Sequence, residues 1–246
     1  MQKREHKGIF YVAAVLITMM TAGLAGCSKT GSSTSTTGAA TYVNVMHMAP
    51  YAPAIDIYLN GKISSTAGGI PPGTFSQQYG PLMPGTYDVQ FKKANADSLL
   101  AEIPASDYDT MSFYTLILYN TMPTGGTVRA IKIVDDFSHV SAASSNYRFF
   151  NLSPDCASVD FYLTNSTPVM TGRTPIDNFI NPALNAFMPV TGGPYNLQVK
   201  AAGTDSVIAY LNNVGLQTGS AYTIFLSGIK NGTNNTHQIN VLLASY

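Results

Sequence analysis

The fold is decided by the stretch Ala54-Ile55-Asp56-Ile57-Tyr58-Leu59, which returns later in the chain as Ser158-Val159-Asp160-Phe161-Tyr162-Leu163. In both places apolar side chains alternate with polar or amphipathic ones, a period of two that is typical of a β-strand with one buried face. Pro53 and Gly61 lie on either side of the first stretch and are turn signals. The two stretches therefore predict the same half-buried strand at two places in the chain.

The similarity between the two halves extends well beyond these strands. The stretch over residues 42–50 returns as residues 148–154, which match residues 44–50 at an offset of 104 positions. After a four-residue insertion between Asn165 and Asn181 the offset becomes 108, and it pairs Tyr87, Gln90, Lys92, Asp97, Ser98, Tyr114, Thr115 and Ile131 with Tyr195, Gln198, Lys200, Asp205, Ser206, Tyr222, Thr223 and Ile239. A match that keeps its register over this length indicates an internal duplication.

Each copy is expected to contain about seven short strands, because turn residues recur roughly every eight to twelve positions. The expected strands lie near residues 42–48, 55–60, 75–79, 87–92, 98–103, 111–119 and 127–135 and near their counterparts in the second copy. No helical stripe separates them, so βαβ units are not expected. The sequence predicts an all-β protein with two tandem immunoglobulin-like antiparallel β-sandwich domains, 41–140 and 146–246, joined by a serine-rich linker near 136–146.

The N-terminus has the features of a secretory signal. Lys3, Arg4 and Lys7 precede an apolar run over residues 9–23, which is short for a bilayer span. The run ends in Leu24-Ala25-Gly26-Cys27, which resembles the lipobox of bacterial lipoproteins. The resemblance implies a signal peptide over 1–26, lipidation of Cys27 (palmitate among the acyl chains) and attachment to a membrane. Residues 27–40, rich in Ser, Thr, Gly and Ala, would then form a flexible tether.

Composition excludes several classes of protein. Only 11% of the 246 residues are charged and 45% are hydrophobic, so the chain is not intrinsically disordered. Its 13 basic and 13 acidic side chains give no net positive field, so nucleic acid is not an expected partner.

A motif in each half carries a resemblance to a known family. It is spelled Ala49-Pro50-Tyr51-Ala52-Pro53-Ala54-Ile55-Asp56-Ile57-Tyr58-Leu59-Asn60-Gly61, and in the second half Asn151-Leu152-Ser153-Pro154-Asp155 followed by Val159-Asp160-Phe161-Tyr162. This pattern resembles the domain of unknown function 4397 family over residues 42–243. The resemblance implies a secreted or lipid-anchored bacterial β-sandwich protein, often with tandem copies and without established catalytic residues. Cys156-Ala157-Ser158 departs from the Ala-Pro-Ala that the pattern leads one to expect.

The mid-strand carboxylates are the first candidates for a binding site, because aspartate is disfavoured inside a strand. Asp56 and Asp160 could face a ligand, paired with Lys92 or Lys200 and flanked by Tyr58 or Tyr162. The alternative is that each carboxylate accepts hydrogen bonds from the backbone of a neighbouring turn or from a cross-strand partner. Gln90 and Lys92, with Gln198 and Lys200, could likewise form a binding stripe or a solvated sheet face that discourages edge pairing.

Residues for other chemistry are sparse. The histidines lack zinc-ligand spacing, Cys156 has no activating histidine nearby in sequence, and no nucleophile or phosphate-loop motif is present. No metal, cofactor or catalytic residue is therefore expected. We expect a non-catalytic binding or structural display module anchored in the cell envelope, with the outer membrane favoured and an envelope protein or a glycan as partner. The alternatives are an accessory carbohydrate-active or hydrolytic lipoprotein with a site at the junction of the repeats, or a subunit of a surface assembly.

Overall fold

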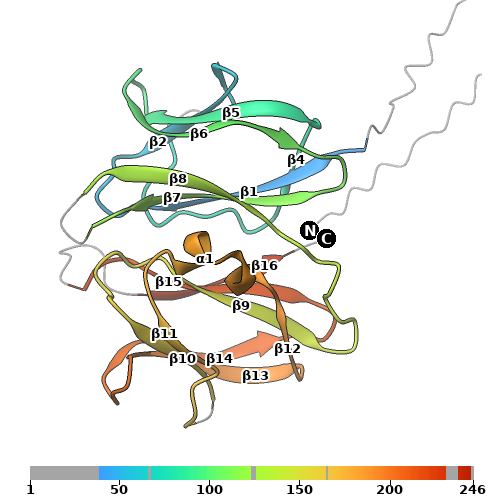
Figure 1. Ribbon diagram of the computed structural model, residues 1–246, viewed down its shortest axis with the longest axis vertical. Helices are drawn as coiled ribbons and strands as arrows, with labels where there is room; N and C mark the ends of the chain where they lie inside the picture. Colours follow the sequence, from blue (N-terminus) through green and yellow to red (C-terminus); the bar gives the residue numbers. More distant parts are fainter. Residues whose placement is uncertain (1–38, 66–67, 123–125, 165, 231–237, 245–246) are drawn as a thin grey trace, which may run out of the picture. The chain divides into compact units, whose positions relative to one another are not determined.

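Strands make up nearly all of the regular structure that the computed structural model describes, which covers residues 39–65, 68–122, 126–164, 166–230 and 238–244 (Figure 1). These residues belong to one compact unit, Thr37–Tyr246. The predicted signal peptide, Cys27 and nearly all of the predicted tether lie outside the described residues. Within the described part, no helix combines the length and the hydropathy needed to cross a bilayer.

The first half folds into two four-stranded sheets. Their orders are β4-β1-β7-β8 and β3-β2-β5-β6, and buried side chains from both sheets, among them Ile57, Phe91 and Leu116, share one core cluster. The strands are β1 (Thr41–Met48), β2 (Ile55–Leu59), β3 (Lys62–Ile63), β4 (Gly80–Leu82), β5 (Gly85–Lys93), β6 (Leu99–Tyr108), β7 (Phe113–Asn120) and β8 (Val128–Val134).

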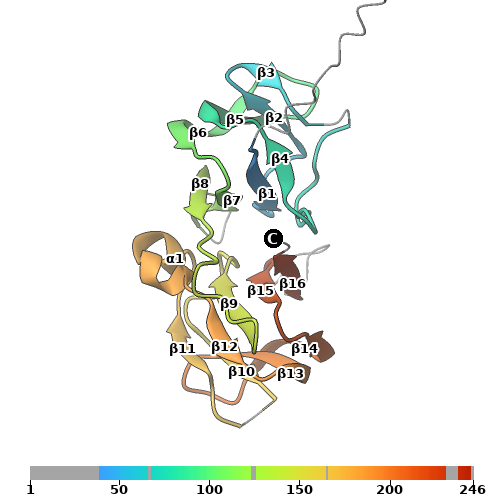
Figure 2. The same cartoon turned by 90° about the vertical axis from the view of Figure 1, so that its right-hand side faces the viewer.

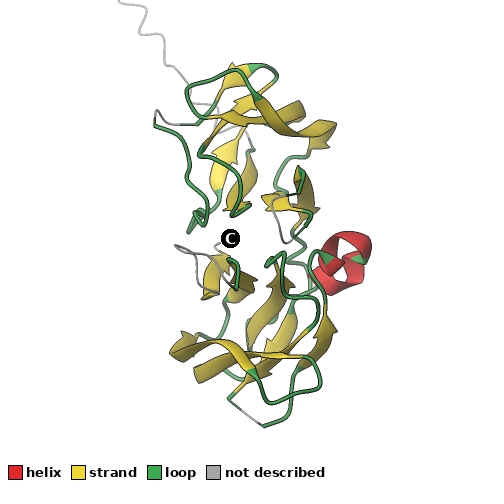
Figure 3. Cartoon of the chain, turned by 90° about the vertical axis from the view of Figure 1, so that its left-hand side faces the viewer, coloured by secondary structure: helices red, strands yellow, loops and turns green. Residues whose placement is uncertain are grey.

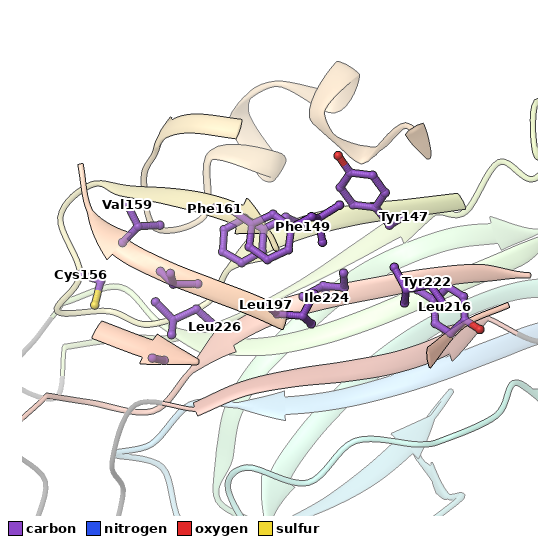
Figure 4. Close-up of a cluster of buried hydrophobic side chains, with 13 residues drawn as sticks. Tyr147, Phe149, Cys156, Val159, Phe161, Leu197, Leu216, Tyr222, Ile224 and Leu226 are labelled. Atoms are coloured by element: carbon purple, nitrogen blue, oxygen red, sulfur yellow. The ribbon is translucent and has the colours of Figure 1, made fainter. Parts of the chain in front are cut away.

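The second half repeats this pairing strand by strand, in the orders β12-β9-β15-β16 and β11-β10-β13-β14 (Figure 2). In its core the rings of Phe149 and Phe161 stack at 4.6 Å, and Figure 4 shows them among the other buried side chains. The strands are β9 (Ser145–Asn151), β10 (Val159–Leu163), β11 (Met170–Arg173), β12 (Met188–Val190), β13 (Gly193–Ala201), β14 (Val207–Leu216), β15 (Ala221–Ser227) and β16 (Gln238–Ala244).

The predicted all-β sandwich fold is confirmed, but the detail of the sheets differs from the expectation. Strands β1 and β7 are parallel, as are β9 and β15, so the sheets that contain them are mixed rather than antiparallel. Parallel neighbours need a long connection, and here all the strands between β1 and β7 supply it. Each half contributes eight strands to its sheets rather than about seven.

The prediction of a strand over residues 75–79 is wrong. Phe75 makes only an isolated bridge to Met46, and a bend at Gln77 and Gln78 separates that bridge from β4. The chain therefore pairs with β1 at two separate places, the bridge at Phe75 and the short strand β4. A period of two in the sequence does not show this interruption.

Two short helical segments lie in the second half, α1 (Asp177–Ile180) and the 3-10 turn η1 (Pro182–Asn185), and they stand out among the strands in Figure 3. Helix α1 falls at the end of the stretch where the sequence offset changes from 104 to 108, and η1 directly follows that stretch. The insertion is thus the place where the second half departs from the plan of the first.

A buried ion pair connects the two halves. Asp135 follows β8 and accepts a hydrogen bond from the Arg148 guanidinium of β9 at 2.6 Å, and both side chains are 0% exposed. The other carboxylate oxygen accepts from Tyr79 (2.7 Å) and Thr115 (2.6 Å), while Arg148 Nε donates to Thr223 (2.8 Å). Each buried charge therefore has several partners, which offsets the cost of removing it from water.

Apolar contacts between the halves surround this ion pair. One buried cluster draws on both, with Met46, Met48, Ile117 and Ile133 from the first and Phe150, Leu152 and Phe225 from the second. Within the serine-rich segment expected to be a linker, Phe137 stacks on Phe187 at 5.1 Å. The connection between the halves is thus packed against both of them.

Candidate functional site

The two mid-strand carboxylates, Asp56 and Asp160, accept hydrogen bonds from neighbouring turns and loops. Asp160 accepts hydrogen bonds from Gly172 N (2.8 Å) and Gly203 N (2.9 Å). Asp56 accepts from Asn95 N (3.0 Å) and from the Ser65 hydroxyl (3.3 Å). Both carboxylates are buried, and neither takes its hydrogen bonds from a lysine. The geometry matches the alternative in which each aspartate holds neighbouring turns.

This arrangement predicts a stability loss for Asp160→Asn. In asparagine an NH₂ group replaces one of the two carboxylate oxygens that accept these bonds. Either Gly172 N or Gly203 N therefore loses its acceptor. We expect the free energy of unfolding to fall by about 1–3 kcal/mol, measured by urea denaturation. Asp205→Asn is the matched control, because that side chain is fully exposed and its replacement should change stability by less than about 1 kcal/mol. Equal effects of the two variants would contradict the structural role of Asp160.

The lysines of the predicted stripe lie over tyrosine rings. Lys92 Nζ is 4.4 Å from the centre of the Tyr58 ring and 3.8 Å from Asp97, and Lys200 Nζ is 4.7 Å from Tyr162 and 3.4 Å from Asp205. In the strand register Asp56 lies opposite Lys92 and Tyr58 opposite Gln90, and Asp160, Lys200, Tyr162 and Gln198 repeat this. The sheets therefore bring the predicted residues together twice, with the lysine charges turned toward tyrosines and exposed carboxylates. A ligand-binding role for the stripes stays a prediction.

A pocket of about 380 Å³ lies where β8 faces α1 and η1. Ile131 and Ile133 of β8 and Phe179 of α1 give it an apolar lining, while Asp136 and His139 are exposed polar residues at its edge. Lys132 also lines the pocket, but its ammonium is bound to Ser106 and to the backbone of Asp107. The pocket thus combines an apolar interior with a polar entrance, and we call it the junction pocket.

The helical wall of the junction pocket is held by its own polar network. Arg173 makes a two-pronged ion pair with Asp177 (2.8 and 2.9 Å) and donates to the buried Asn178 amide (2.9 Å). Asn178 in turn bonds to the backbone of Leu184 (3.0 Å) and to the Asn185 side chain (3.2 Å). A wall fixed in this way is suited to binding, because it does not have to be ordered when a ligand arrives.

The carboxylate at the pocket entrance is stabilised in its charged form. Hydrogen bonds from the side chain and the backbone of Ser138 hold the pKa of Asp136 below its usual value. Asp136 is therefore ionised at neutral pH and a poor proton donor.

Burial keeps two other reactive side chains, His47 and Cys156, in their uncharged forms. Burial lowers the pKa of His47, whose Nε2 lies 3.0 Å from the Pro53 carbonyl oxygen, so the ring is neutral. Burial raises the pKa of Cys156 and keeps it a thiol. Among the described residues, no three His, Cys, Asp or Glu side chains gather in a group that could hold a metal ion.

Sequence reasoning missed the residues of the junction pocket. Phe179 and His139 belong to no motif, because Phe179 lies in the stretch where the offset changes and His139 lies in the serine-rich segment between the copies. The usable signal was the insertion, because a segment present in one copy only is free to serve something other than the shared fold.

The described residues thus form an all-β protein of two sandwiches, with the junction pocket between β8 and the helical segments α1 and η1. Residues 41–162 match the family model described as Domain of unknown function (DUF4397), which supports assigning this part of the chain to that family. The match covers the first sandwich and ends within β10. No curated protein matches the chain.

Proposed function

We propose that the protein is a lipid-anchored bacterial envelope protein that binds a saccharide in the junction pocket and catalyses no reaction. The single observation that carries this proposal is that the stretch where the repeat is broken, between Asn165 and Asn181, supplies Asn178 and Phe179 to the wall of the pocket. Features shared by both halves, such as the mid-strand aspartates, serve the fold. A feature found in one half only needs a different explanation.

The shape and lining of the pocket favour a sugar residue over a charged or fully apolar ligand. Its volume is at the lower end of the range for small-molecule sites. A sugar has an apolar C–H face and a rim of hydroxyls, which suit an aliphatic and aromatic interior with a polar entrance. Phe179, half-buried and packed against Tyr119 at 4.9 Å, offers the ring on which such a face could lie.

Hydrolysis of the bound sugar is the weaker alternative. Glycosidases generally use two carboxyl groups, one of which must be protonated to act as an acid. Asp136 is the one carboxylate among the described residues that line the pocket, and its pKa is lowered rather than raised. The pocket thus favours binding.

The binding proposal is tested on a glycan array with the Phe179→Ala variant. We expect the wild-type chain to bind a subset of envelope glycans and Phe179→Ala to lose at least tenfold in affinity, because the stacking ring is gone. Ile180→Ala is the matched control, since the neighbouring side chain on α1 is 81% exposed and does not line the pocket. Absence of glycan binding by the wild type, or equal binding by both variants, would contradict the proposal.

The anchor is a separate prediction. If Cys27 carries the lipid, metabolic labelling with palmitate should mark the wild-type chain, and Cys27→Ser should abolish the label and release the protein from the membrane fraction. We propose the outer membrane as its location, to be checked by density fractionation of labelled cells. Label retained by Cys27→Ser would overturn the anchor without affecting the junction pocket.

A further inference from the structure

We propose that the first sandwich contains a second binding site, a partly open cavity for a small neutral amphiphile. The cavity has a volume of about 250 Å³ and lies between the two sheets of the first half, beside the edge strand β4. It shares no lining residue with the junction pocket, so the two sites are independent.

The cavity has a polar end and an apolar end. Ser64 and Ser76 are exposed and mark its mouth, whereas Ile57, Tyr108 and Leu116 are buried at its inner end. The part of the core cluster that borders the cavity is incompletely packed, because Val43 and Val45 are only half-buried.

The second sandwich fills the corresponding space with side chains. In the first half Val43 lies opposite Gly80, and in the second half Tyr147 lies opposite Met188 at the same register. Val45 pairs with Leu116, and at the equivalent place Phe149 pairs with Ile224.

Three of these four exchanges enlarge the side chain in the second half, and the fourth, between Leu116 and Ile224, keeps its size. Tyr147 and Phe149 are 4% and 0% exposed, and Met188 packs against the same cluster. The second half has the same sheet orders with larger side chains at these positions, so the architecture does not require the open space in the first half.

The lining identifies the class of ligand. Among the residues that the structure describes, no charged side chain lines the cavity, so a charged group inside it would lack a partner. An apolar cavity of about 150 Å³ is enough to bind benzene, so this one accommodates a larger molecule. An aliphatic tail would lie against Val43, Val45 and Leu116, and an uncharged hydroxyl or ester head would meet the serines at the mouth.

The test uses 1-octanol as the probe, titrated calorimetrically into the chain from residue 27 onward with Cys27→Ser. We expect saturable binding of one molecule per chain. Val45→Phe introduces the residue of the second half and should weaken binding at least tenfold while leaving the melting temperature unchanged or higher. Gly80→Met is the second variant, since a Cβ there meets nothing closer than the Val43 carbonyl oxygen at 3.8 Å.

Leu99→Phe serves as the control, because Leu99 is 51% exposed and does not line the cavity. It should bind 1-octanol like the wild type, and so should Phe179→Ala, which affects only the junction pocket. The proposal is overturned if the wild type does not bind 1-octanol, or if both cavity-filling variants bind it as tightly as the wild type.

Discussion

Replacing Asp135 by alanine is expected to lower the free energy of unfolding by about 3–5 kcal/mol. The reason is the Arg148 guanidinium, which is 0% exposed and would lose its charge partner while staying buried between Phe150 and Phe187. Tyr79 and Thr115 would also lose the acceptor of their hydroxyl protons. Because these residues come from both halves, the loss should weaken the connection between the sandwiches.

Urea denaturation measures the effect, with Asp97→Ala as the control. Asp97 also pairs with a basic side chain, but it is 99% exposed, so its removal should cost no more than about 1 kcal/mol. The double variant Asp135→Ala/Arg148→Met should recover much of the lost stability, because it removes both buried charges. A loss below 1 kcal/mol in Asp135→Ala would show that the ion pair does not hold the halves together.

Phe149→Ala is expected to cost about 3–5 kcal/mol as well, because it leaves a large cavity in a filled core. The ring is 0% exposed and stacks on Phe161 with an angle of only 5° between the two planes. The same substitution at the equivalent position of the first half, Val45→Ala, should cost less than about 1.6 kcal/mol, since it removes two half-buried methyl groups at about 0.8 kcal/mol each.

Thermal and urea unfolding of the two variants provide the comparison. Similar losses in Phe149→Ala and Val45→Ala would mean that the two sandwiches are packed equally well. The contrast between a filled and an open core would then be wrong.

The main strands could be predicted because their residues carry both a period and a repeat. Around Asp56 and Asp160 the alternation of apolar and polar residues predicts the strand. It does not predict the burial, because all five residues of β10 and the first three of β2 are buried rather than every second one. The parallel pairing of β1 with β7 could not be predicted, since it depends on contacts between segments about seventy residues apart. Strand β3, only two residues long, is too short to show any period.

The candidate site was predicted less well, for a physical reason. An aspartate inside a strand signals that its charge needs partners, but the sequence cannot say whether those partners are a ligand or the N–H groups of Gly172 and Gly203. The junction pocket escaped prediction because Ile131, Phe179 and His139 lie far apart in the chain and form no motif. Only the insertion after Asn165 marked the segment that builds its wall.

The most direct test of the binding account maps the ligand onto the protein by NMR. The isotope-labelled chain is titrated with the saccharide that gives the strongest signal on the glycan array, and backbone amide shifts are followed. We predict that the shifts concentrate at Ile131, Ile133, Phe179 and Asn185. Shifts confined to Tyr58, Lys92, Tyr162 and Lys200 would instead assign binding to the sheet stripes and contradict the junction pocket as the site.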